Sequence, residues 1–245
     1  MKTKKLKLST VILTSAFILM VLGVFASNLV LKDVYKKIDK GDVYWNYNRV
    51  LEQPFKHLKI NGGNITNIVF EQNKKSSLKV LSDWYQYKKD VTFTARVNND
   101  TLYVNFPNNY NNAGEREWMR RTVLIRLFTP QLLSINGVNT NLALHKLNQS
   151  AISVNISGKS MLGIESYSRN FNVINITEAD SSQVIFKMSP ELNGSKNIHF
   201  GNVTAHLKNY SLLEIGHGYA DKLDLNIADS SAVTLSGRSL KSIQK

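Results

Sequence analysis

The chain has 245 residues, of which 42% are hydrophobic, 20% are charged and four are proline, so it can bury an ordinary core and wholesale disorder is excluded. It has no cysteine, which excludes disulfides, thiolate metal sites, a cysteine nucleophile and a lipidated N-terminal cysteine. The net charge of +13 divides into +4 for residues 1–31, +7 for residues 32–130 and +2 for residues 131–245. Because the basic charge is spread out, we expect no nucleic-acid partner.

Residues 1–31 have their own composition. Four lysines precede an uncharged apolar stretch of 24 residues, from Leu8 to Leu31. A helix needs about 20 apolar residues to cross a bilayer, so residues 8–31 predict a transmembrane helix whose partner is the lipid bilayer. The lysines predict a cytoplasmic N-terminus in the cytoplasmic (inner) membrane, with residues 32–54 as a juxtamembrane linker and residues 55–245 as an extracytoplasmic, periplasmic domain.

A cleaved signal peptide is the alternative interpretation of this leader. Ala26, with Val24 two positions before it, resembles a cleavage site, and cleavage there would give a secreted or surface protein. Apolar residues continue to Leu31, past that site, which favours retention of the helix. Aromatic residues follow, and they are typical either of a membrane interface or of the first buried face of the domain: Tyr35, Tyr44, Trp45 and Tyr47.

Residues 55–130 are rich in predicted strands. Turn signals at residues 61–64 (Asn-Gly-Gly-Asn) and 98–100 (Asn-Asn-Asp) separate short stretches of alternating apolar residues. The polar, asparagine-rich segment from Pro107 to Arg121 predicts an excursion from these strands. Alternation resumes at Val123 and ends at Pro130.

An internal repeat begins near residue 130. Each copy has alternating apolar residues, a short polar turn that usually holds a serine, and a second alternating apolar pair. The apolar residues that precede the turns are separated by 21, 20, 31 and 20 positions, and they are Ile135, Ile156, Ile176, Leu207 and Ile227. The longest interval holds a predicted loop from Lys187 to Asn197.

This period predicts the fold. Period-two alternation indicates half-buried strands, and a unit of about 20 residues is too small to bury its own apolar face, so the units must stack. We therefore predict an all-β domain, a single-stranded parallel β-helix with aliphatic columns inside it, preceded by one N-terminal transmembrane α-helix. An antiparallel sandwich is the alternative, but it does not require a serine that recurs at the turns.

The layout of these segments resembles a known family. The similarity is carried by residues 55–64 (Phe-Lys-His-Leu-Lys-Ile-Asn-Gly-Gly-Asn), residues 99–104 (Asn-Asp-Thr-Leu-Tyr-Val), residues 129–132 (Thr-Pro-Gln-Leu) and the serine-centred repeats. Over residues 50–240 the chain resembles the auto-transporter adhesin head domain, or GIN domain, common in Bacteroidota. The resemblance implies a right-handed parallel β-helix exposed in the bacterial envelope and suggests adhesion. It supplies no catalytic residues.

Candidate site residues are few. The turn serines can bond the turn backbone or neighbouring layers, and their repetitive face could offer donors and acceptors to an extended ligand; they are Ser160, Ser182, Ser211 and Ser231. Asp180 and Asp229 occupy equivalent corners and His217 lies between two glycines, so these are the exposed candidates. We expect no catalytic residue, no metal ligand and no cofactor.

The favoured function is a membrane-anchored envelope protein that is not an enzyme and uses the β-helix as a binding or adhesion surface. The expected ligand is a glycan or another envelope protein, and self-association at the ends of the stack is a further expectation. The alternative is a carbohydrate-active enzyme, a polysaccharide lyase or hydrolase, on the same scaffold. A sensor that signals through the helix is less favoured, because only seven residues precede Leu8.

Overall fold

The structure is a computed structural model that describes residues 7–39, 41–87, 93–107, 117, 119–166, 171–187, 198–216, 218–235, 237 and 240. It divides into two units, residues 1–45 and residues 46–245. The first unit contains α1 (Leu8–Lys37), a helix whose described side chains are exposed through Lys36. At 1.5 Å per residue, its 30 residues span about 45 Å, more than the hydrocarbon core of a bilayer. This helix is long and apolar enough to cross a membrane, a property that signal sequences share.

The second unit is built mostly of strands. Its first elements are β1 (Tyr47–Leu51), β2 (His57–Asn61), β3 (Asn67–Gln72), β4 (Ser77–Leu81), α2 (Ser82–Tyr87), β5 (Thr94–Asn98), β6 (Thr101–Asn105) and β7 (Val123–Thr129). The repeat region contributes β8 (Ser134–Val138), β9 (Asn141–Leu147), β10 (Ala151–Ser157), β11 (Met161–Ser166), β12 (Phe171–Glu178), β13 (Gln183–Lys187), β14 (Ile198–Leu207), β15 (Leu212–Ile215), β16 (Gly218–Ile227) and β17 (Ala232–Leu235).

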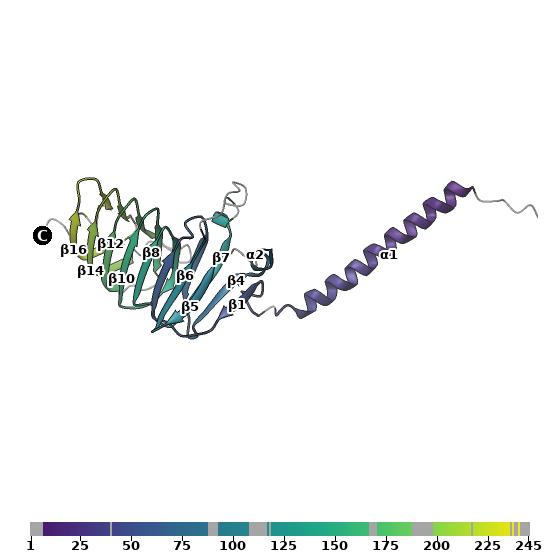
Figure 1. Cartoon of the computed structure of the whole chain (residues 1–245), viewed down its shortest axis with the longest axis horizontal. Coiled ribbons are helices and arrows are strands. Elements are labelled where there is room, and N and C mark those ends of the chain that lie inside the picture. Colours follow the sequence, from purple (N-terminus) through teal and green to yellow (C-terminus); the bar gives the residue numbers. More distant parts are fainter. Residues whose placement is uncertain are drawn as a thin grey trace, which may run out of the picture. The chain divides into compact units, whose positions relative to one another are not determined.

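These strands form two sheets. Sheet A has the order β1-β4-β7-β3-β9-β11-β13-β15-β17, and sheet B has the order β16-β14-β12-β10-β8-β2-β6-β5. Figure 1 shows the strands of sheet B side by side, from β5 in blue to β16 in yellow-green. From β8 onward, successive strands alternate between the sheets, and each strand from β8 to β15 pairs in parallel with the strand two places later in the chain. One strand from each sheet therefore makes one layer of the stack.

The predicted single-stranded parallel β-helix does not describe the whole domain. Both sheets are mixed, because β1 with β4, β4 with β7 and β5 with β6 pair antiparallel. The layers also do not follow chain order: β2 and β3 lie between β6 and β7 on one side and β8 and β9 on the other. The chain after β7 must therefore cross the layer of β2 and β3 before it starts β8. The prediction of a mostly β domain, preceded in the chain by one apolar helix, is confirmed.

The predicted alternation places the core between the two sheets. Ile156 and Ile176 are buried, as are most inward side chains of the middle layers. Ile227 is 42% exposed because β16 is the last strand of sheet B. Ten of the eleven residues from Lys187 to Asn197, all but Lys187, lie outside the described residues. So does most of the segment after Leu235, at one end of the stack where self-association is expected.

The aromatic residues after the helix differ in their surroundings. Tyr47 belongs to β1, its hydroxyl donates to the backbone carbonyl of Val123 at 2.7 Å, and the Arg126 guanidinium lies 5.2 Å from its ring centroid. Trp45 is instead 56% exposed, and most of the Tyr35 side chain is exposed as well. Tyr47 is thus part of the domain, within the segment predicted as linker.

Two turns show how local residues shape the layers. In the β5–β6 hairpin, Asn99 and Asp100 have φ of 47° and 57°, the left-handed conformation that a two-residue hairpin requires. After β2, Gly62 and Gly63 have φ of 83° and 82°. A Cβ on Gly63 would lie 2.8 Å from the ring of Phe106, so glycine lets that ring close the corner of the core.

Candidate functional site

The turn serines lie inside the corners of the stack. Three of the four are buried and Ser231 is half-buried; the set is Ser160, Ser182, Ser211 and Ser231. Ser160 Oγ donates to the carbonyl of Ser157 at 2.6 Å and accepts from the backbone N–H of Thr140 at 3.1 Å. The hydroxyls of Ser211 and Ser231 lie 3.3 Å apart in adjacent layers. These serines hold the turns together, so their hydroxyls form hydrogen bonds within the stack and are not presented to a ligand.

The structure does not bring the candidate aspartates into contact. Asp180 is exposed with φ of 58°, and its Oδ1 accepts a hydrogen bond from Nδ2 of Asn209 at 3.0 Å. Asn209 occupies the same corner one layer on, with φ of 52°, and Asp229 follows in the layer after it. The partner of Asp180 is therefore an amide. His217 lies outside the described residues.

One carboxylate beside a corner of the stack is buried and not exposed to solvent. Glu178 ends β12 with its side chain in the aliphatic column, between Ile156 and Leu207 of the adjacent layers. Neither carboxyl oxygen has a hydrogen-bond partner among the described residues. Loss of solvation raises the pKa of Glu178 to about 8; the backbone N–H of Val184 opposes the rise, although it lies outside hydrogen-bond geometry with either oxygen. At pH 7 this carboxyl is mostly protonated.

Sheet B presents a continuous polar surface on its outer side, because alternate residues of each strand point away from the core. Cross-strand register aligns these residues in two rows, which together we name the polar face. The first row is Arg96, Tyr103, Lys59, Asn136, Asn155, Thr177, His206 and Asn226. The second row is Asn98, Thr101, His57, Ser134, Ser153, Asn175, Thr204 and Asp224.

The polar face has local structure of its own. A shallow hollow of about 330 Å³ lies over β8, β10 and β12, where side-chain amides and hydroxyls predominate. At its margin, Nδ1 of His57 lies 2.7 Å from Oγ of Ser134, its register partner. Farther along the first row, the Lys59 ammonium and the Arg96 guanidinium lie 6.0 and 5.7 Å from the ring centroid of Tyr103. The surface therefore offers many neutral donors and acceptors beside one cation-flanked aromatic ring.

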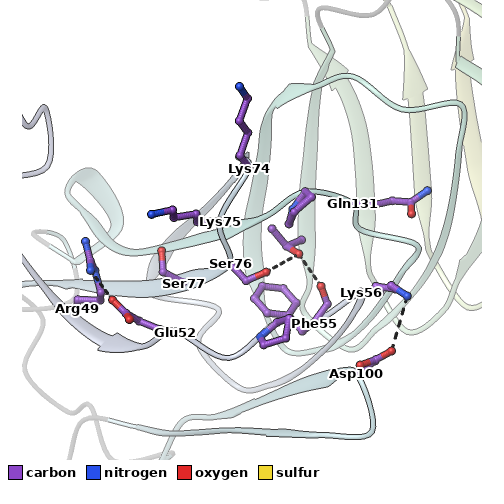
Figure 2. A pocket seen from close by; sticks show the side chains of 13 residues that line it. Arg49, Glu52, Phe55, Lys56, Lys74, Lys75, Ser76, Ser77, Asp100 and Gln131 are labelled. Carbon is purple, nitrogen blue, oxygen red and sulfur yellow. Dashed lines mark hydrogen bonds and ion pairs between the residues drawn. The ribbon is translucent and has the colours of Figure 1, made fainter.

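A second concave region lies where the chain crosses from β7 to β8, and we name it the crossover pocket. It encloses about 750 Å³. Its lining comes from β1 and the segment after it, the turn between β3 and β4 with the start of β4, the exit of β7, and the β5–β6 turn. Figure 2 shows these side chains. The charged members of that lining are Arg49, Glu52, Lys56, Lys74, Lys75 and Asp100. The pocket thus holds four basic and two acidic side chains.

The structure contains two histidine–carboxylate pairs that the sequence does not predict. Nε2 of His145 lies 3.4 Å from Oε2 of Glu165, and Nε2 of His199 lies 2.8 Å from Oδ2 of Asp221, with the His199 ring stacked on Tyr219. The partners are 20 and 22 residues apart, so the repeat period brings them together rather than a short metal-ligand spacing. No group of three or more possible metal ligands occurs within the described part of the chain.

Comparison with known proteins gives matches at the level of structure. No protein-family model matches the sequence, and no curated protein does. A crystal structure from Parabacteroides distasonis, provisionally named a lipid binding protein, has a TM-score of 0.51 at 16% identity and covers 77% of this chain and 72% of its own. This similarity shows a shared fold.

Two further crystal structures, both provisionally named adhesins, match more loosely. The protein from Bacteroides fragilis has a TM-score of 0.41 at 9% identity, over 78% of this chain and 96% of its own. The protein from Parabacteroides merdae has a TM-score of 0.33 at 10% identity, over 78% of this chain and 95% of its own. Membership in the GIN family stays a prediction.

Proposed function

We propose that this chain is a membrane-anchored envelope protein whose β domain, residues 46–245, binds an extended glycan through the polar face without catalysis. In this proposal α1 is the retained anchor, the domain is extracytoplasmic and GIN-like, and the layers from β8 to β17 wind as a right-handed parallel β-helix. The observation that carries the proposal is the pair of polar rows that run across the eight strands of sheet B, in a domain that follows an apolar helix in the chain.

The geometry of the rows favours an extended ligand. Neighbouring strands repeat about every 4.8 Å, so equivalent side chains recur at that interval along the sheet. Asn136 and Asn155 are register partners in the first row, and both are exposed. Each amide offers two donors and an acceptor, which suits the hydroxyl groups of a sugar chain. A ligand with its own repeat can contact successive layers in the same way.

The chemistry of the face favours binding over turnover. His57 and Ser134 form a hydrogen-bonded pair, but their contact follows from strand register, and among the described residues no carboxylate forms an ion pair with His57. A serine nucleophile needs a base that a third group orients. The hydrogen-bond partner of Asp180 is the amide of Asn209 and not another acid. Two acids that act as a catalytic pair lie roughly 5 to 9.5 Å apart.

A glycan array with the full chain in phosphatidylcholine nanodiscs tests the binding. Replacing both Asn136 and Asn155 with alanine removes two amides from the centre of the face, and each lost hydrogen bond costs about 0.5 to 1.5 kcal/mol, so affinity for a captured glycan should fall about tenfold. The matched control replaces Asn141 and Gln183 with alanine on the outer side of sheet A, and it should bind normally. Equal binding by the two double variants would exclude the polar face as the site.

A reducing-sugar assay on the same glycans tests the enzymatic alternative. We expect no product release from the wild-type chain. If the wild-type chain releases reducing sugar and Asp180→Asn or Asp229→Asn does not, the protein is a carbohydrate-active enzyme and a purely binding role is contradicted. The same assay on Ser134→Ala would reveal catalysis by the His57–Ser134 pair.

A further inference from the structure

We propose a second ligand site, independent of the polar face: the crossover pocket binds a phosphate monoester carried by a small polyol. The pocket encloses about 750 Å³, within the range of sites that hold small organic ligands rather than a lone ion. It belongs wholly to the β domain, and it exists because the segment after β7 crosses the layer of β2 and β3.

Hydrogen bonds fix the walls of the pocket before any ligand arrives. Thr129 Oγ1 donates to the carbonyl of Phe55 at 2.5 Å and lies 3.1 Å from the hydroxyl of Ser76. The backbone N–H of Lys56 donates to the carbonyl of Asp100 at 2.8 Å, which joins the β5–β6 turn to the segment before β2. Four segments distant in sequence are thus held together, so a ligand need not order them, which lowers the cost of binding.

The charges of the pocket are not balanced. Arg49 pairs with Glu52, and Nζ of Lys56 lies 3.8 Å from Oδ2 of Asp100. Lys74 and Lys75 form no ion pair with a carboxylate among the described residues, and both are exposed on the turn between β3 and β4. Figure 2 shows them on the same turn as Ser76. The pocket therefore carries two positive charges that its own carboxylates do not neutralise.

This excess selects the chemical class of the ligand. A phosphate monoester carries about −1.5 to −2 charges at pH 7 and three acceptor oxygens, whereas a carboxylate carries one charge. Lysine ammonium groups are mobile point charges on flexible stems, so Lys74 and Lys75 can converge on a single phosphate. The serines of the turn and Gln131 add neutral hydrogen-bonding groups for the hydroxyls of a polyol.

Calorimetric titration of the full chain in phosphatidylcholine nanodiscs with glycerol 3-phosphate tests the site. We expect binding that weakens at least about tenfold in the double variant K74Q/K75Q, because hydrogen bonds to charged groups are the strong ones. The control K159Q/K208Q removes the same charge from two exposed corners of the repeat region and should bind as wild type does. Affinity should also fall between pH 7.5 and pH 5, since the second phosphate pKa is about 6.

A second arm identifies the source of the phosphate. If the natural ligand is a lipid headgroup, phosphatidic acid in the nanodiscs should compete and raise the apparent Kd for glycerol 3-phosphate in the wild type. An unchanged Kd would point to a free phosphate monoester. The proposal is overturned if glycerol 3-phosphate binds no better than glycerol, or if K74Q/K75Q and K159Q/K208Q bind it equally. Neither result bears on glycan binding by Asn136 and Asn155.

Discussion

The hydroxyl of Thr129 donates a hydrogen bond to the backbone carbonyl of Phe55, and the two oxygens lie 2.5 Å apart. The first residue ends β7, and the second comes just before β2. Their bond joins two points that are 74 residues apart in the chain, at the place where the order of the layers departs from the order of the sequence. It also fixes one wall of the crossover pocket.

Replacing Thr129 with valine should destabilise the domain. Valine keeps the shape of the buried side chain but leaves the carbonyl of Phe55 without this donor, which costs about 1 to 3 kcal/mol for a buried group. Urea denaturation of the full chain in detergent measures the change in the free energy of unfolding. Thr177→Val, on the exposed side of sheet B, is the control and should change it by less than about 0.5 kcal/mol. Equal effects of the two substitutions would contradict the proposed role of the bond.

Burial of Glu178 should make stability depend on pH. Its pKa is about 8 in the folded chain against 4.5 for an ordinary glutamate, so between these values the folded state holds a proton that the unfolded state has released. The free energy of unfolding should therefore fall by about 1.4 kcal/mol per pH unit as pH rises from about 4.5 to 8, with no further contribution from this group outside that interval.

Glu178→Gln tests this dependence, because glutamine keeps the size of the side chain and cannot ionise. The difference in unfolding free energy between variant and wild type, measured in urea at pH 5, 6, 7 and 8, should grow in favour of the variant as pH rises. Glu214→Gln, on the outer side of sheet A, makes the same chemical change and should leave the wild-type pH dependence in place. Parallel curves for Glu178→Gln and wild type would show that Glu178 is not the group responsible.

The turn serines should differ in their contribution to stability. Ser160→Ala removes both a donor to Ser157 and an acceptor for the N–H of Thr140 in a buried corner, so we expect a loss of about 1 to 3 kcal/mol. Ser231→Ala removes the contact with Ser211 in the last layer, the one side-chain bond of Ser231 among the described residues, so it should cost less than about 1 kcal/mol. Chemical denaturation of both variants provides the comparison. A larger loss for Ser231→Ala would reverse the expected order.

The sequence predicts the layers of the repeat region well but not the arrangement before it. Alternation and the recurrent serine are local signals, and they locate β10 and β11 and the burial of Ile156 correctly. The choice of neighbours for β6 and β7 depends on non-local packing, because any half-buried strand has edges that can pair with several others. The hairpin turn at Asn99 and Asp100 predicts that β5 and β6 pair but not which layer they join.

The candidate sites illustrate the same distinction. The polar face follows from the alternation that buries the core, so a repetitive polar surface could be predicted, although its position on sheet B and the His57–Ser134 contact require the register. The crossover pocket depends on the changed order of layers and has no signal in the sequence. Glu178 comes immediately before a corner where a carboxylate is usually solvated, and only its place in the aliphatic column shows that it is buried.

The N-terminal helix is expected to be retained in the mature protein. Arginine at Leu19 and Leu22 would place two charges near the middle of α1, and each costs about 2.5 to 3.5 kcal/mol on scales of membrane insertion, so the double variant should become extractable from membranes at alkaline pH. The wild-type chain should stay in the membrane fraction, and mass spectrometry should detect residues 8–31 in it. Leu19→Val and Leu22→Val together keep the segment apolar and should leave the chain in the membrane. A wild-type product that starts just after Ala26 would instead identify a signal peptide.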